Sequence, residues 1–171
     1  PFGEDMPPFI LDSASISGKE ATIQLDGKAK ESGIYQIAVE NGPVMLIVND
    51  SKEISIDLDL AKKDNYYSVK GSDASNELRN FILDYSEKGF AVNRAYTQLD
   101  SLKHFSGNDS LLLLATDQKN KAVKELNTLL SNELKAAKDP AVGLFVLGMS
   151  SRSLSKEEFE KSMNEVTDRK S

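Results

Sequence analysis

The sequence predicts an α+β fold, in which an antiparallel β-sandwich of about six short strands precedes an α-helical region. Apolar residues up to Val69 alternate with polar ones, as in half-buried strands, and after Ser72 they recur every three or four residues, as on a helix. Gly71-Ser72-Asp73 stands between the two patterns and has the composition of a turn that caps a helix. We therefore expect a β-sandwich domain over residues 1–70 and a helical domain or subdomain over residues 71–171.

Composition restricts the classes of partner. The chain has 171 residues and a net charge of −6, with acidic residues spread along it. This balance disfavours nucleic acid and anionic membrane surfaces as partners, because both attract an excess of Lys and Arg. The longest apolar runs, Leu111–Ala115 among them, are far shorter than the roughly 20 residues that span a bilayer. The chain has no cysteine, which excludes disulfides and thiol chemistry by these residues.

The β half is predicted from alternation and turn signals. Strands are expected over residues 9–16, 21–25, 33–39, 44–48, 54–60 and 66–69. Asp26-Gly27 and Asn41-Gly42 are dipeptides that favour tight hairpin turns, and Asn41-Gly42 is the stronger signal because both its flanks have strand composition. Val44–Val48 is apolar at every position, which predicts a strand covered on both faces and favours helices packed on the sheet or on its edge.

The α half is predicted as a long helical hairpin and two shorter helices. Helices are expected over residues 74–105 and 110–137, joined by a short polar turn at 106–109. Gly89 inside the first helix is compatible with a bend there. Asp139-Pro140 predicts the start of a third helix, and Ser155 with Glu158 forms a capping box for a fourth.

The polar candidates for a site are a set of acidic residues in the β half and the single histidine. Glu53, Asp57, Asp59 and Asp64 could supply carboxylates to a calcium ion, but side chains on a strand diverge and no Ca²⁺-binding loop motif is present, so a solvated acidic face is the better interpretation. His104 is the only histidine and has no nucleophile or metal ligand in its own motif. We predict no catalytic residue, no metal and no cofactor.

Aromatic side chains supply the remaining candidates. Tyr85, Phe90, Tyr96 and Phe105 could line a ligand pocket, although at helical spacing a place in the core is the better prediction. If a ligand lies between sheet and helices, its predicted contacts are Tyr35, Tyr66, Tyr67 and Tyr85. Core packing explains each of these four tyrosines as well.

Several short motifs resemble an N-terminal domain of unknown function. This domain precedes a thioredoxin-like domain, of the alkyl hydroperoxide reductase and thiol-specific antioxidant type, in envelope thiol-disulfide oxidoreductases. The residues that carry the resemblance are Asp26-Gly27, Ser32–Ile37, Leu46–Asp50, Ile54–Asp57 and Tyr67–Ser72, followed by Leu78 and Phe81. Members look like a β-sandwich with a Gly-Ser step into helices and a short last helix, here at Ser155–Glu158, before the redox domain. No Cys-x-x-Cys occurs up to Ser171, so none of the family's redox residues is carried over.

The resemblance implies a non-catalytic accessory domain that positions the redox domain, pairs subunits or presents substrate protein. The partners would then be a covalently linked thioredoxin-like domain, a second copy or a substrate protein. It also implies a periplasmic or envelope location, with a secretory or lipoprotein signal removed before Pro1. The alternative is a freestanding envelope β-sandwich module that binds a glycan or a peptide. A third hypothesis is that the region only mediates dimerisation.

Overall fold

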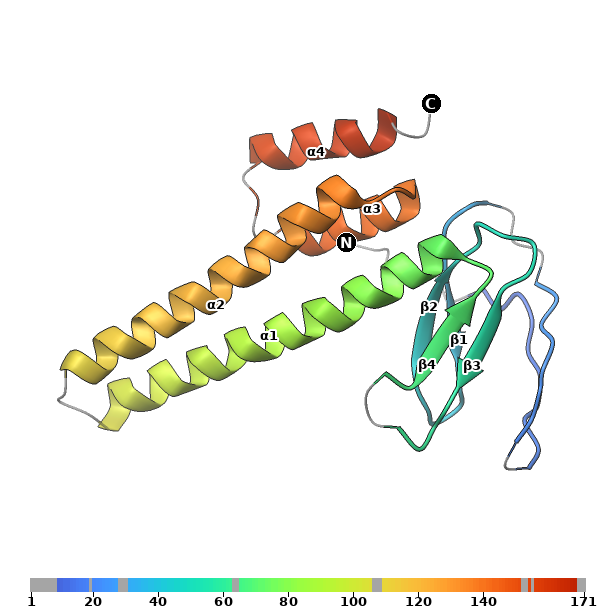
Figure 1. Ribbon diagram of the computed structural model, residues 1–171, viewed down its shortest axis with the longest axis horizontal. Coiled ribbons are helices and arrows are strands. Elements are labelled where there is room, and N and C mark those ends of the chain that lie inside the picture. The colour runs from blue at the N-terminus through green and yellow to red at the C-terminus, as the bar shows by residue number, and fades with distance from the viewer. Residues whose placement is uncertain are drawn as a thin grey trace. The chain divides into compact units, whose positions relative to one another are not determined.

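The computed structural model describes residues 9–18, 20–27, 31–62, 65–105, 109–151, 154 and 156–168. They fall into two compact units, residues 1–32 and residues 33–171, and each is described by itself. All strands and helices of the described residues lie in the second unit. Figure 1 shows them in chain order.

The predicted six-stranded β-sandwich is wrong. The described residues form four helices and two small antiparallel sheets, each with two strands. One sheet pairs β1 (Ile34–Ala38) with β2 (Val44–Val48), and the other pairs β3 (Ser55–Leu58) with β4 (Tyr67–Lys70). The fold is therefore dominated by helices, with small sheets at one end of the longest of them.

The first unit explains much of this difference. Residues 9–16 and 21–25 alternate like strands, yet neither segment forms a strand. Instead of a ladder bond, the side chain of Asp12 accepts the backbone N–H of Asp26 at 2.7 Å, and Phe9 and Ile10 are 82% and 73% exposed. Alternation shows which face a strand would bury, but a strand also needs a neighbouring backbone to take its N–H and C=O groups. The expected turn at Asp26-Gly27 thus has no strand before it.

The hairpin predicted at Asn41-Gly42 is confirmed. β1 and β2 pair from Ile34 with Val48 to Ala38 with Val44. Asn41 adopts a left-handed φ of 56°, and the backbone N–H of Gly42 donates to the carbonyl of Val39 at 2.9 Å. Asn tolerates this conformation better than most residues that have a side chain.

Strand β2 is covered on both faces from Met45 to Val48, as its composition predicts, whereas Val44 at its start is 47% exposed. Val48 and Leu46 belong to the main helical core, whereas Met45 belongs to a smaller cluster with Tyr67 and Val69 of β4. Successive side chains of a strand point to opposite faces. β2 therefore separates the two apolar clusters, and the expectation that helices pack on the sheet is confirmed.

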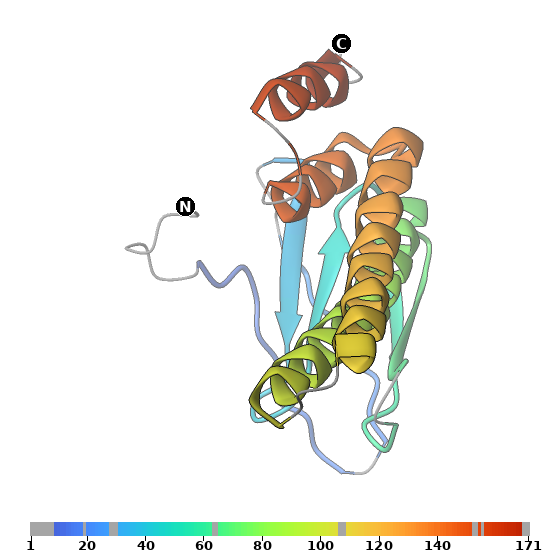
Figure 2. The ribbon, with the colours of Figure 1, turned by 90° about the vertical axis from the view of Figure 1, so that its left-hand side faces the viewer.

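Helix α1 (Asp73–Phe105) and helix α2 (Asp109–Ala136) form the long hairpin. Figures 1 and 2 both show α2 running alongside α1 in the opposite direction. Both helices end within two residues of their predicted bounds. Gly89 does not interrupt α1, since the helix continues through it. Residues 106–108 of the expected turn lie outside the described residues.

The main core lies where the hairpin meets the sheet. Its buried side chains come from β2, the first three turns of α1, the last part of α2, helix α3 (Pro140–Ser150) and helix α4 (Lys156–Asp168). Phe81 and Leu78 are among its largest fully buried members. Asp139 caps α3 by accepting the N–H of Ala141 at 2.7 Å, as predicted. Ser155 and the side chain of Glu158 lie outside what the structure describes.

Buried serine hydroxyls join α1 to the sheet. Ser72 is the N-terminal cap of α1, and its Oγ accepts the backbone N–H of Ser75 at 2.9 Å. The Oγ of Ser75 accepts the N–H of Val48 at 2.9 Å and donates to the carbonyl of Val48 at 3.1 Å. In addition, Asp50 accepts the N–H of Ala74 at 3.2 Å. These bonds satisfy backbone groups of both β2 and the start of α1 that would otherwise be buried without partners.

No helix in the described ranges combines the length and the apolar character needed to cross a membrane.

Candidate functional site

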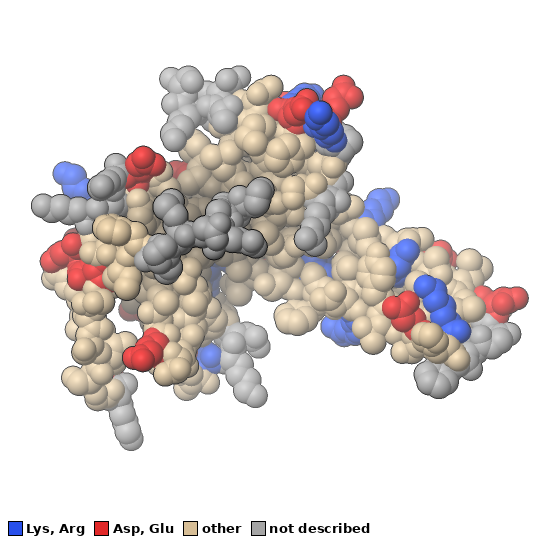
Figure 3. All heavy atoms as spheres, turned by 180° about the vertical axis from the view of Figure 1, so that it is seen from behind, with Lys and Arg blue, Asp and Glu red and all other residues tan. Residues whose placement is uncertain are grey.

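The outer half of the hairpin is the least buried helical part of the second unit. We define it as the distal arm, residues 88–105 of α1 and 109–125 of α2. Among its described residues only Leu99 and Ala115 are buried. Large apolar side chains are exposed on it, namely Phe90, Tyr96, Leu111, Leu113 and Leu114. Lys, Arg, Asp and Glu side chains also lie on the arm, as Figure 3 shows from behind.

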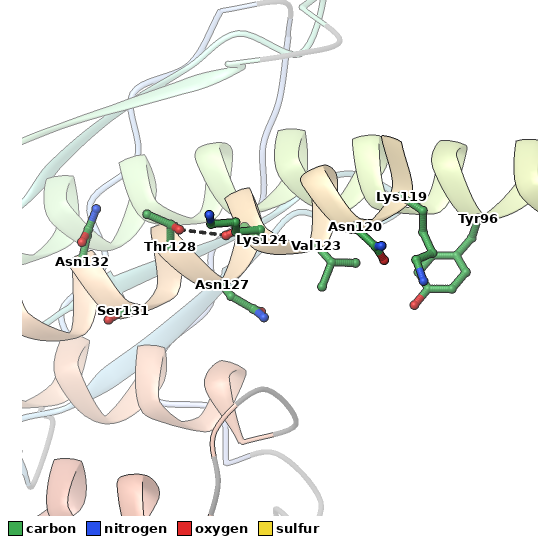
Figure 4. A pocket seen from close by; sticks show the side chains of 9 residues that line it. All are labelled: Tyr96, Lys119, Asn120, Val123, Lys124, Asn127, Thr128, Ser131 and Asn132. Carbon is green, nitrogen blue, oxygen red and sulfur yellow. Dashed lines mark hydrogen bonds between the residues drawn. The ribbon is translucent and has the colours of Figure 1, made fainter. Parts of the chain in front are cut away.

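A groove of about 480 Å³ runs along α2 from the distal arm toward the core. Tyr96 of α1 stands at one end, and the other lining residues come from α2 (Figure 4). They are Lys119, Asn120, Val123, Lys124, Asn127, Thr128, Ser131 and Asn132. The lining is therefore rich in amides and hydroxyls, has two ammonium groups and includes no carboxylate.

The periodicity of α2 places three of these side chains, Asn120, Val123 and Asn127, in one stripe. Asn120, Val123 and Asn127 extend together to one side of α2 (Figure 4), and Leu130 and Leu134, seven residues after Val123 and Asn127, are buried in the main core. Steps of three and four residues keep side chains on one face. This stripe of the groove therefore lies along the face of α2 that is buried in the main core further along the helix.

Two contacts engage side chains that line the groove. The ammonium of Lys119 lies 5.7 Å from the centre of the Tyr96 ring, a cation–π distance. The hydroxyl of Thr128 donates to the carbonyl of Lys124 at 2.8 Å, so its proton is engaged within the helix. The amides of Asn120 and Asn127 have no hydrogen-bond partner among the described residues. These amides are free to bind a ligand.

The four predicted tyrosine contacts do not line this groove. Tyr66 and Tyr67 lie together, with ring centres 5.3 Å apart, and the hydroxyl of Tyr66 donates to the carbonyl of Val44 at 3.0 Å. Tyr67 is buried, and burial raises the pKa of its hydroxyl. Tyr85 packs on Phe81 in the main core, at 5.8 Å between ring centres. Tyr35 is half-buried on β1.

Arg79 connects β4 to α1 beside this tyrosine pair. Its guanidinium lies 5.2 Å from the centre of the Tyr67 ring, and its Nε donates to the backbone carbonyl of Tyr67 at 2.7 Å. Tyr67 thus has structural contacts on both its ring and its backbone.

The core assignment was wrong for part of the aromatic set. Tyr85 is in the core, but Phe90 and Tyr96 are 70% and 46% exposed. The side chain of Phe105 lies outside the described residues. Tyr96 was therefore placed in the wrong environment, and the amides of α2 were missed. The signal that could have found them is the polar stripe of Asn120, Asn127 and Ser131 at steps of seven and four residues.

The acidic residues behave as surface charges. Asp57 pairs with Lys70 on the neighbouring strand at 2.8 Å, and Asp59 pairs with Lys62 at 3.8 Å. Asp64 lies outside the described residues. No group of three or more potential metal ligands occurs in the described part of the chain. His104 is exposed in the last turn of α1.

One carboxyl between the long helices is perturbed. Partial burial of Glu133 on α2 raises its pKa, and the charges of Asp84 and Glu77 on α1 raise it further. Glu77 also accepts the backbone N–H of Lys138 at 3.1 Å. We assign this group to the hairpin interface, because its neighbours are like charges and core residues.

No family model, curated protein or solved structure matches this chain. The resemblance to the domain that precedes thioredoxin-like domains therefore stays a prediction.

Proposed function

We propose that this chain is the non-catalytic accessory part of an envelope thiol-disulfide oxidoreductase, and that it presents substrate protein to a thioredoxin-like domain in the same polypeptide. The sequence resemblance supports the link to redox chemistry. The distal arm and its groove support presentation, and this exposed surface is the observation on which the proposal depends.

The length of the distal arm and its anchoring at one end suit the presentation of a substrate protein. α1 has 33 residues and is therefore about 50 Å long at 1.5 Å per residue. Its first turns are fixed in the main core and capped by Ser72, whereas its outer half contributes mainly exposed surface. A helical hairpin anchored at one end in this way presents a binding surface at a set distance from its base. Partners recognise such surfaces through grooves and exposed side chains.

The reading frame beyond Ser171 gives the first test. We expect it to encode a thioredoxin-like domain with a Cys-x-x-Cys pair. A stop codon directly after Ser171 would reject the proposal.

The activity of the full-length protein gives the second test. We expect removal of the distal arm to raise KM for an unfolded disulfide-containing protein such as scrambled ribonuclease, while kcat/KM for oxidised glutathione stays unchanged. A small disulfide needs no presenting surface, so it serves as the matched control. Equal loss with both substrates would contradict presentation.

The groove also favours the freestanding binding module as a second candidate. Its amide and hydroxyl lining is suited to a ligand rich in hydrogen-bonding groups, whether or not a redox domain follows. The same stop codon that rejects the first function would favour this one.

A further inference from the structure

We propose that the groove along α2 binds an unfolded, acidic polypeptide segment in an extended conformation, with Asn120 and Asn127 holding its backbone. Such a segment would be the substrate of the function proposed above, so the assignment rests on that function for its biological meaning. The binding itself is testable without the redox domain.

Asparagine amides match a peptide backbone. Each side-chain amide offers a carbonyl acceptor and an N–H₂ donor, and can therefore bond both the N–H and the C=O of an extended chain regardless of its sequence. Asn120 and Asn127 are two helical turns apart, about 10.5 Å at 1.5 Å per residue. A polyproline II segment repeats its orientation every three residues, or about 9.3 Å. This conformation is common in unfolded chains, so both amides can reach equivalent backbone groups.

The charges of the groove select the kind of segment. Lys119 and Lys124 are the charged lining residues, in a chain whose net charge is −6. A positive groove on an acidic protein favours carboxylates among ligand side chains and disfavours basic segments. Val123, between the two asparagines, adds an apolar contact for an aliphatic side chain.

The aromatic residue argues against a glycan. Sugars commonly lie flat on an open aromatic face, and Tyr96 is the aromatic residue that lines the groove. The Lys119 ammonium lies over that ring at 5.7 Å. A sugar would have to displace this cation–π contact, whereas a peptide held by the amides would not.

Fluorescence anisotropy tests the assignment with synthetic 12-residue peptides on this chain. The first peptide contains Glu, Ser and Leu, the second replaces every Glu with Lys, and the third keeps the acidic sequence but carries N-methylated backbone amides. We expect the first to bind and the other two to bind at least about tenfold more weakly. For the N-methylated peptide, loss of one or two backbone hydrogen bonds accounts for a change of that size. For the Lys peptide, the cause is repulsion by Lys119 and Lys124.

Paired variants locate the site. Asn120→Ala with Asn127→Ala should weaken binding of the acidic peptide about tenfold or more, whereas Gln118→Ala with Lys121→Ala, on exposed positions of α2 outside the groove, should leave it unchanged. Ala is the better helix former, so loss of folding does not explain a change.

Three results would overturn the assignment. They are the absence of acidic-peptide binding, equal affinity for the N-methylated peptide, and tighter binding of a hyaluronan oligosaccharide than of the peptide. If the asparagine variant retains affinity while removal of the distal arm abolishes it, the groove is not the binding site and the proposed function stands. If the groove binds peptide but the reading frame stops after Ser171, the proposed function is wrong and the assignment of the groove as a peptide site is kept.

Discussion

Gly71 makes the change from β4 to α1 possible. Its φ is +85°, and a Cβ atom there would lie 2.7 Å from the backbone oxygen of Glu53. The position needs a residue that adopts left-handed backbone geometry and has no side chain. Immediately after it, Ser72 caps α1 and Ser75 bonds to Val48. The chain can therefore change from strand to helix within two residues.

Gly71→Ala is expected to lower the free energy of unfolding by at least about 2 kcal/mol, through a strained φ and a backbone clash. Gly89→Ala is the matched control, because it adds the same methyl group to a helix at a place with nothing within 4 Å. It should raise the free energy of unfolding by up to about 1 kcal/mol. Urea denaturation followed by circular dichroism measures both, and equal effects would contradict the role of Gly71.

At the scale of elements, the α1–α2 interface contains an unfavourable charge. The pKa of Glu133 is raised above its ordinary value of 4.5, so the folded state holds its proton more tightly than the unfolded state does. This contribution to stability is present below about pH 4.5 and is lost as the pH rises through the folded pKa. At neutral pH the ionised, partly buried carboxylate of Glu133 is repelled by Asp84 and Glu77, which lowers the stability of the folded state.

Glu133→Gln is therefore expected to raise the melting temperature at pH 7, and its advantage should disappear near pH 4. Thermal unfolding at several pH values checks this. Glu87→Gln, on the exposed side of α1, is the control and should show no comparable gain. A gain for Glu133→Gln that is the same at every pH would mean that charge is not the cause.

The packing of α4 on α3 depends on a second glycine. A Cβ at Gly143 would lie 2.9 Å from Cγ1 of Val166, which is fully buried. Val is stiff at χ1 and cannot easily move aside. The two helices thus approach closely where α3 has no side chain.

Gly143→Ala is expected to destabilise the protein by about 1–3 kcal/mol through overpacking, despite its better helix propensity. In a Val166→Ala background the same change should become stabilising, because the clashing methyl groups are gone. A double-mutant cycle in urea measures the coupling. Gly148→Ala, on α3 with open space around it, controls for helix propensity, and a cycle with no coupling would refute the close contact.

In the second unit as a whole, the main core and the distal arm lie at different ends of the hairpin, and the groove extends from the arm onto the part of α2 that carries Leu130. The main core draws on α1 up to Tyr85 and on α2 from Leu126 onward. The distal arm contributes only Leu99 and Ala115 to the described buried residues. Interaction surfaces commonly occupy parts of a protein that its core does not need.

Replacing residues 89–122 with a short Gly-Ser turn is therefore expected to leave a single cooperative thermal transition and to weaken binding of the acidic peptide, because Tyr96, Lys119 and Asn120 of the groove are removed. Calorimetry and anisotropy on the same sample test both. A parallel variant with a Gly-Ser insertion at residues 106–108 keeps the arm and should bind as before. Loss of cooperative unfolding in the shortened chain would show that the arm belongs to the core.

The local structure that depends on neighbouring residues can be predicted from the residues alone. The helices over α1 and α2, the Asp139 cap of α3 and the hairpin at Asn41-Gly42 follow from periodicity, capping and turn chemistry. The burial of β2 on both faces could also be predicted, because its residues are apolar at every position. These features need no knowledge of distant contacts.

Contacts between distant parts of the chain determine which strands pair and which side chains stay exposed. Residues 9–16 and 21–25 alternate as β1 does, but a ladder needs a backbone partner, which alternation does not supply. Tyr85 and Tyr96 lie at similar helical spacing, yet the main core covers the first and ends before the second. The groove amides were likewise invisible, because a polar stripe becomes a site only where its neighbours leave it uncovered.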